Sequence, residues 1–335
     1  MQLLLHIALG LLPVSIFLVS LIFLDSFKLI KPFSIVLAIA AGGVIAFACY
    51  LINDSALSYL TIDRTLYTRY ISPVIEEGGK ALYIIILIRS QRVGFMVDAA
   101  VYGFAVGAGF AFVENIYYLQ AVAGTNVLMW ITRGFGTAVM HGGTTAIFGI
   151  ISKSLSEKQS GHSGPLFLLG LLPAIAIHSL FNHFLLPPIP STLLLLIVLP
   201  ALFYFVYKRS EQSTREWLGV NLDADMELLA LISTGNLSES RIGQYLYSLK
   251  SRFSPEVLVD MLCLLRIHTE LSVKSKGVLM MREAGFESPL DPEVKEKFSE
   301  MTYLEKSIGA TGKMAILPFL HTSSRSLWQL YMLKQ

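Results

Sequence analysis

The sequence predicts an all-α protein, a polytopic bundle of about seven transmembrane helices followed by a helical cytoplasmic domain. The composition is 54% hydrophobic and only 15% charged, and the mean hydropathy is +0.61. These values exclude a soluble protein for most of the chain. Residues 1–207 hold 18 Asp, Glu, Lys and Arg side chains, and residues 208–335 hold 32. We therefore divide the chain into a transmembrane domain, residues 1–207, and a polar helical domain, residues 208–335, whose role the sequence leaves open.

Seven stretches are apolar and long enough, or nearly so, to cross a bilayer as helices, which takes about 20 residues. The first has no basic segment before it, so we interpret it as an uncleaved anchor rather than a signal peptide. The third is the shortest and carries the densest charge. The stretches cover residues 3–24, 33–52, 73–88, 95–123, 127–151, 165–186 and 191–207.

Lysine and arginine in the short loops predict the orientation, because cytoplasmic loops carry an excess of both. The loops after the first, third, fifth and seventh stretches contain nine of them, whereas the other side has only Arg64 and Arg69. The N-terminus is therefore expected outside and the C-terminal domain in the cytoplasm. Residues 53–72 are expected to form either an interfacial helix or a plain surface loop.

Helix starts are predicted in the polar domain at Ser254-Pro255-Glu256 and at Asp291-Pro292-Glu293. Each combines an N-cap residue, a proline and an acid in the first turn.

Ionisable side chains interrupt these apolar stretches, where a charged group costs about 2.5–3.5 kcal/mol on insertion scales. At 1.5 Å per residue, Glu76 lies roughly 5 Å from the outer end of its helix, Glu114 and His178 about 12–15 Å, and His141 about 20 Å. They are thus expected to meet in the outer half of the membrane, in a polar site suited to proton chemistry, metal binding or ion conduction. The interrupting residues are Glu76, Glu77, Lys80, Glu114, His141, His178 and His183.

The acidic pair suggests acid–base chemistry. Glu76 and Lys80 are four residues apart and share a helix face, so Lys80 is expected to compensate a carboxylate, whereas Glu77 is rotated by about 100°. Two adjacent carboxylates in a low dielectric do not both ionise easily, which suits a general acid or base. His178 and Asn182 share one face of another helix, and His183 points elsewhere.

The order and spacing of these residues resemble the PrsW family of intramembrane proteases, which is related to the CAAX prenyl proteases and to bacteriocin-processing membrane enzymes. The motifs are Glu76-Glu77-x-x-Lys80, Phe110-x-x-x-Glu114, His141 and His178-x-x-x-Asn182, within about residues 70–190. The resemblance implies an integral protein of a bacterial cytoplasmic membrane. It also implies a single-pass membrane-protein substrate, like an anti-sigma factor, that is cut near the outer face of the bilayer.

Two mechanisms are compatible with the catalytic candidates. In the first, Glu114, His141 and His178 bind a divalent metal such as Zn²⁺ and leave a position for water, with Glu76 or Glu77 as general base. In the second, which needs no metal, a glutamate of the pair activates water while His178 and Asn182 donate to the oxyanion. We favour the first because the number of acids and imidazoles is sufficient to bind a metal ion. The catalytic candidates are Glu76, Glu77, Glu114, His141, His178 and Asn182.

Other functional classes remain open at this point. The same carboxylates would serve a proton- or ion-coupled transporter or a sensor, although no inverted repeat is evident. A metal- or haem-binding membrane protein is a third class. The net charge of +2 gives no nucleic-acid signal, and Cys49 and Cys263 favour neither a disulfide nor a cysteine metal cluster. The oligomeric state is not predicted.

Overall fold

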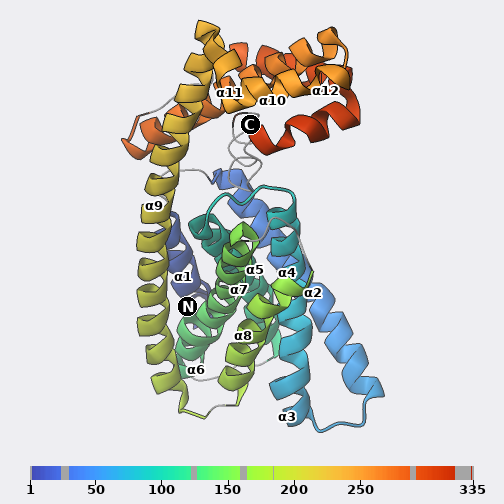
Figure 1. Ribbon diagram of the computed structural model, residues 1–335. Coiled ribbons are helices and arrows are strands. Elements are labelled where there is room, and N and C mark those ends of the chain that lie inside the picture. Colours follow the sequence, from blue (N-terminus) through green and yellow to red (C-terminus); the bar gives the residue numbers. More distant parts are fainter. Residues whose placement is uncertain are drawn as a thin grey trace. The chain divides into compact units, whose positions relative to one another are not determined.

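The computed structural model describes residues 2–23, 30–121, 127–158, 164–183, 185–286, 292–320 and 333. All regular structure in these residues is helical (Figure 1), so the predicted all-α class is confirmed. The elements are α1 (Gln2–Phe23), α2 (Pro32–Tyr59), α3 (Arg64–Leu66), η1 (Tyr67–Ile71), α4 (Ser72–Arg89), α5 (Met96–Ala121), α6 (Val127–Ile131), η2 (Thr132–Ala138), α7 (Val139–Lys158), α8 (Pro165–Asn182), α9 (Pro188–Thr234), η3 (Asn236–Glu239), α10 (Arg241–Ser248), η4 (Leu249–Ser251), α11 (Pro255–Glu283), α12 (Glu293–Ile316) and η5 (Leu317–Phe319).

The chain divides into two compact units, Met1–Ser210 and Glu211–Gln335. The division falls inside α9, so a single helix runs from one unit into the other. The sequence places its boundary at residues 207 and 208, where the charge density rises. The catalytic and cytoplasmic assignments of the two parts stay predictions.

Five of the described helices are long and apolar enough to cross a membrane, namely α1, α2, α5, α8 and α9. The third predicted span, α4, is less apolar because Glu76, Glu77, Lys80 and Arg89 fall within its 18 residues. The fifth predicted span is divided among α6, the π-helix η2 and α7. A membrane helix bundle is thus confirmed, whereas the number of seven spans is not.

Helix α5 forms the centre of the first unit and packs against α7, α2 and α1, while α4 packs against α2, α7 and α8 (Figure 1). Small side chains line much of α5, and Ala105, Ala108 and Ala111 are almost fully buried. Lipid provides no hydrophobic drive for helix association, so such close packing holds a membrane bundle together.

Two backbone contacts set the spacing of α5 from its neighbours. A Cβ on Gly107 would lie 2.2 Å from the carbonyl oxygen of His141 in α7, and one on Gly109 would lie 1.9 Å from that of Ile39 in α2. Real Cβ atoms essentially never come within 3.0 Å of another atom. Glycine at position 107 therefore fixes how closely His141 approaches α5.

Gly107→Ala is expected to destabilise the first unit. The new methyl group must push α7 away from α5, and overpacking of this kind costs about 1–3 kcal/mol. The matched control is Gly78→Ala, because a Cβ at Gly78 meets no atom within 4 Å and alanine favours a helix over glycine. Thermal unfolding of both variants in detergent tests this contact. Equal midpoints would contradict it.

The segment between α2 and α4 is largely helical, because α2 continues to Tyr59 and α3 leads into η1. Asp63 caps α3, its Oδ2 accepting from the backbone N–H groups of Leu66 at 3.1 Å and Thr65 at 2.8 Å. These hydrogen bonds lower the pKa of the Asp63 carboxyl. Whether the segment lies at a membrane interface stays a prediction.

In the second unit, α11 packs against α12. Helix α11 begins at Pro255 with Ser254 as its N-cap residue, as predicted. Helix α12 begins at Glu293, with Pro292 as its N-cap residue, and Asp291 lies outside the described residues.

A buried ion pair connects the polar end of α9 with α11. Lys276 Nζ lies 2.5 Å from Asp225 Oδ2, which also accepts from Ser272 Oγ at 2.5 Å. Burial lowers the pKa of the Lys276 ammonium, and Asp225 partly offsets that shift. We interpret this network as structural.

Candidate active site

Four helices of the first unit bring their ionisable residues together. Helix α4 supplies Glu76 and Glu77, α5 supplies Glu114, α7 supplies His141 and α8 supplies His178. The two imidazole rings meet edge to face with centroids 4.8 Å apart, and both histidines are buried. The convergence expected from helix depth is therefore present in the structure.

Hydrogen bonds to one oxygen orient the Glu76 carboxylate. Its Oε1 accepts from Ser72 Oγ at 2.5 Å and from Asn53 Nδ2 at 3.3 Å, and Tyr67 donates to Asn53 Oδ1 at 3.0 Å. Its other oxygen, Oε2, lies 3.9 Å from His178 Nε2. Three polar side chains thus orient Glu76 toward the histidine pair.

Glu77 has a different environment from Glu76. It is buried, and its Oε1 accepts from Lys80 Nζ at 2.6 Å, from Thr144 Oγ1 at 3.2 Å and from His178 Nδ1 at 2.7 Å. A carboxylate acts only as an acceptor, so Nδ1 of His178 carries the proton and, in the neutral imidazole, Nε2 presents its lone pair. Lys80 thus forms its ion pair with Glu77, three residues before it, rather than with Glu76.

His141 is held at both ring nitrogens. Lys80 Nζ lies 3.1 Å from Nδ1, and Glu114 Oε2 lies 3.0 Å from Nε2. Because an ammonium is only a donor, Nδ1 accepts and Nε2–H donates to the carboxylate. His141 therefore connects the Glu77–Lys80 pair with Glu114.

Arg133 and Thr144 are site residues that the sequence did not predict. Arg133 Nη2 lies 3.3 Å from Glu114 Oε1, its Nε donates to Asn115 Oδ1 at 3.0 Å, and its guanidinium lies 3.6 Å from the centroid of the Tyr118 ring. The π-helix η2 carries Arg133, and Asn115 Nδ2 in turn donates to the Gly10 carbonyl at 2.9 Å. The available signal was an arginine within an apolar span, which rarely lacks a partner. No sequence feature of this kind indicated that Thr144 would donate a hydrogen bond to Glu77.

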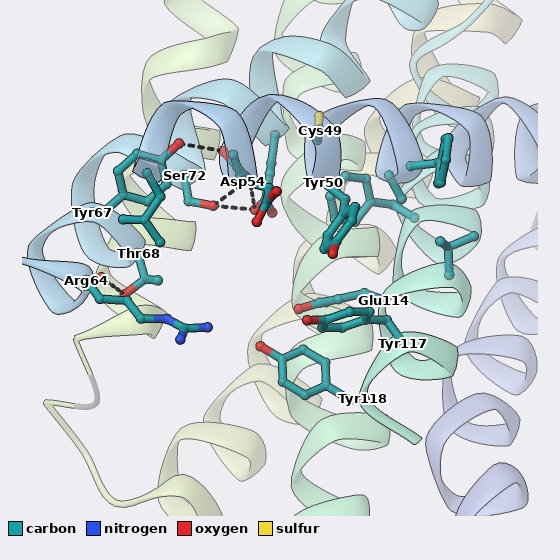
Figure 2. Close-up of a pocket in the computed structure, with 17 residues that line it drawn as sticks. Cys49, Tyr50, Asp54, Arg64, Tyr67, Thr68, Ser72, Glu114, Tyr117 and Tyr118 are labelled. Carbon is teal, nitrogen blue, oxygen red and sulfur yellow. Dashed lines mark hydrogen bonds between the residues drawn. The ribbon is translucent and has the colours of Figure 1, made fainter. Parts of the chain in front are cut away.

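The cluster adjoins an open pocket of about 360 Å³, and both Glu76 and Glu114 line it. Figure 2 shows Tyr50, Tyr117 and Tyr118 on one side, and the Arg64 side chain reaching in from the opposite side. The lining residues are Ala46, Phe47, Cys49, Tyr50, Asn53, Asp54, Leu57, Arg64, Tyr67, Thr68, Ser72, Glu76, Phe110, Val113, Glu114, Tyr117 and Tyr118.

The atoms placed best for a metal ion belong to Glu76, His141 and His178, whose ligand atoms all lie within 4.8 Å of one another. The sequence predicted Glu114 in place of Glu76. In the described part of the chain, Glu114 instead forms ion pairs with Arg133 and His141. A carboxylate with two imidazoles is a donor set typical of zinc.

Asn182 and His183 lie at the end of α8 and contact η1. Asn182 Nδ2 donates to the Thr68 carbonyl at 3.0 Å, and the His183 ring meets Tyr70 edge to face at 4.9 Å. Ser179 Oγ adds a hydrogen bond of 2.6 Å to the Arg69 carbonyl. The structure therefore does not direct the Asn182 amide toward the histidine pair, as an oxyanion donor requires. Its contacts fix η1, the turn before Glu76.

One protein family matches this chain. Its sequence model, described as PrsW family intramembrane metalloprotease, matches residues 31–207, which is more than half of the chain and includes all four motifs. No curated protein and no solved structure gives a significant match.

Proposed function

The chain belongs to the PrsW family of intramembrane metalloproteases, and we propose that its Glu/His cluster hydrolyses a peptide bond of a membrane-protein substrate. The observation that carries this proposal is the meeting of Glu76, Glu114, His141 and His178 from four helices beside an open pocket. A membrane-embedded peptidase needs a polar site of this kind within an apolar bundle.

The residues present fit a divalent metal ion. Glu76, His141 and His178 would hold it, and His178 already presents Nε2 while Glu77 holds the proton on Nδ1. His141 would bind the ion through one of its two ring nitrogens, which contact Lys80 and Glu114. When bound, such an ion polarises the peptide carbonyl and makes water a better nucleophile near neutral pH.

Each carboxylate then has a role of its own. Glu77 orients His178, as a carboxylate behind a ligating histidine does. Glu114 lines the pocket and is held by Arg133 and His141. We therefore assign to Glu114 the role of the general base, which accepts a proton from the attacking water. This assignment replaces the choice between Glu76 and Glu77 as general base.

The positions of these residues favour cleavage near the outer face. The pocket lies between the C-terminal ends of α2 and α5 and the N-terminal end of α4. The lysine and arginine distribution predicts that this end of the bundle is extracytoplasmic. A single-pass membrane protein, like an anti-sigma factor, would present its juxtamembrane segment there.

The function is tested by comparing the N-termini of membrane proteins in bacteria that express the wild type, Glu76→Gln or Glu157→Gln. New termini on the outer side of single-pass proteins are expected with the wild type and with Glu157→Gln, and not with Glu76→Gln. Glu157 is a matched control because its side chain is 15% exposed, like that of Glu76, and it is ion-paired in α7 outside the cluster. Identical termini in all three strains would reject the proposal.

Arg133→Gln is expected to lower kcat by about 10²-fold, because a small displacement of a catalytic group has an effect of that size. KM should change little, since Arg133 holds Glu114 rather than the substrate. Arg133→Lys keeps the charge but loses the Nε–H group that donates to Asn115 and the stacking on Tyr118, so it should recover part of kcat. A rise in KM at unchanged kcat would instead place Arg133 in substrate binding.

A further inference from the structure

We propose that the crevice between the outer parts of α2 and α5 is the entrance through which the substrate reaches the cluster sideways from the bilayer. The occupant is an extended juxtamembrane segment of a membrane protein. This inference rests on the proposed function and adds the route and the conformation of the substrate.

The backbones of α2 and α5 are in contact near Gly42, and the pocket lies between the two helices nearer their C-terminal ends. A Cβ on Gly42 of α2 would lie 2.0 Å from the Val106 carbonyl oxygen of α5, so the backbones are in contact there. One to four turns further along α2, residues from Ala46 to Leu57 line the pocket, and so do residues from Phe110 to Tyr118 of α5. The glycine contact therefore forms the closed end of a V-shaped crevice, and the pocket occupies its open end.

Two tyrosines form the lip of this crevice. The rings of Tyr50 in α2 and Tyr117 in α5 lie 5.2 Å apart, and Figure 2 shows both beside the pocket. They are 44% and 45% exposed, and Phe47 beside them is 59% exposed. All three belong to helices that can cross a membrane. Aromatic side chains with a polar tip suit the boundary between lipid and water, so a lateral opening at this lip faces the bilayer.

The chemistry of hydrolysis determines the conformation of the occupant. In an intact helix each peptide group is hydrogen-bonded within the helix and surrounded by side chains. Hydrolysis requires a peptide bond that the attacking water can reach. The segment that lies in the pocket beside Glu76 and Glu114 is therefore extended.

An extended chain inside a bilayer needs partners for its backbone groups. The lining offers them at the end away from the glycine contact, where Asp54, Arg64 and Thr68 lie, all of them exposed. Among the described residues the Arg64 guanidinium has no ion pair within 4.0 Å, and it extends toward the side of Tyr118 (Figure 2). The pocket is thus apolar at the lipid-facing lip and polar at the aqueous end. A juxtamembrane segment has the same polarity, since it is apolar where it leaves the bilayer and polar where it enters water.

Bridging the lip tests the entrance. Tyr50→Cys and Tyr117→Cys are combined in a background with Cys49→Ala and Cys263→Ser, and the pair is joined by a short bis-methanethiosulfonate that reductant removes. Two substrates are followed in liposomes: the membrane protein identified by its new N-terminus, and a soluble peptide of about twelve residues that spans the same bond. The single-cysteine variants with the same reagent are the controls.

After bridging, cleavage of the membrane protein should fall by about tenfold or more and recover on reduction, whereas cleavage of the peptide should stay within about twofold, because only the membrane protein needs the gate. Equal cleavage of both substrates after bridging would overturn the proposal, and so would equal loss of both. If the unbridged protein cuts neither substrate, the proposed function itself fails, which separates the two conclusions.

Discussion

Glu76→Gln is expected to abolish both peptide hydrolysis and metal binding, whereas Glu114→Gln is expected to abolish hydrolysis and leave the metal in place. Glu76 belongs to the convergent group with His141 and His178, so its amide removes a charged oxygen ligand. Glu114 contacts His141 from the side and lines the pocket. Its amide removes the proton acceptor, and loss of a general base lowers the rate by about 10²–10⁴-fold.

The two variants are compared by metal content per purified chain and by hydrolysis of the substrate identified in cells. His183→Gln is the matched control, because His183 is the C-cap residue of the helix that carries His178 but contacts Tyr70 and the Ser179 carbonyl. It should keep both metal and activity. If Glu114→Gln lost its metal, Glu114 would be a metal ligand together with His141 and His178, as the sequence predicted. An active wild-type protein without metal would favour the metal-free mechanism.

The meeting of Glu76, Glu114, His141 and His178 was predictable from the sequence for two physical reasons. Charged side chains within apolar spans need partners, and the fixed rise of a helix places each of them at a known depth. Neither reason depends on how the helices are rotated. The site was therefore predictable as a set of residues, before any contact between them was known.

The individual contacts were not predictable, because several side chains on neighbouring turns and helices compete for the same hydrogen-bond partner. Lys80 can reach a side chain three or four residues before it, and it pairs with Glu77 because Ser72 and Asn53 take an oxygen of Glu76. Asn182 shares a face with His178, yet its amide bonds to the Thr68 carbonyl. Such choices depend on residues far away in the sequence.

Two features of the fold have no sequence pattern of their own. The π-helix η2 carries Arg133, and the π-helix η1 leads into α4, which carries Glu76; π-helices are rare and short, so no sequence periodicity predicted them. Helix α9 continues across the change in charge density because a polar surface does not end a helix. The shift in composition at residue 208 therefore indicates a change of environment and not the end of an element.

Glu77→Gln is expected to weaken metal binding by about 10- to 100-fold, the usual effect of removing the carboxylate behind a ligating histidine. It should also destabilise the first unit. Lys80 is fully buried and forms its ion pair with Glu77, and a buried charge that loses its partner costs about 3–5 kcal/mol. One substitution is thus predicted to affect both the chemistry and the stability.

The double variant Glu77→Gln/Lys80→Met separates these effects. Without the ammonium there is no unpaired buried charge, so the thermal midpoint should rise above that of Glu77→Gln alone. His178 still lacks its carboxylate, so metal binding should stay weak. Arg92→Met, which removes an exposed cation, is the control and should unfold like the wild type. If metal binding returned in the double variant, His178 would owe its orientation to its packing in α8 and not to Glu77.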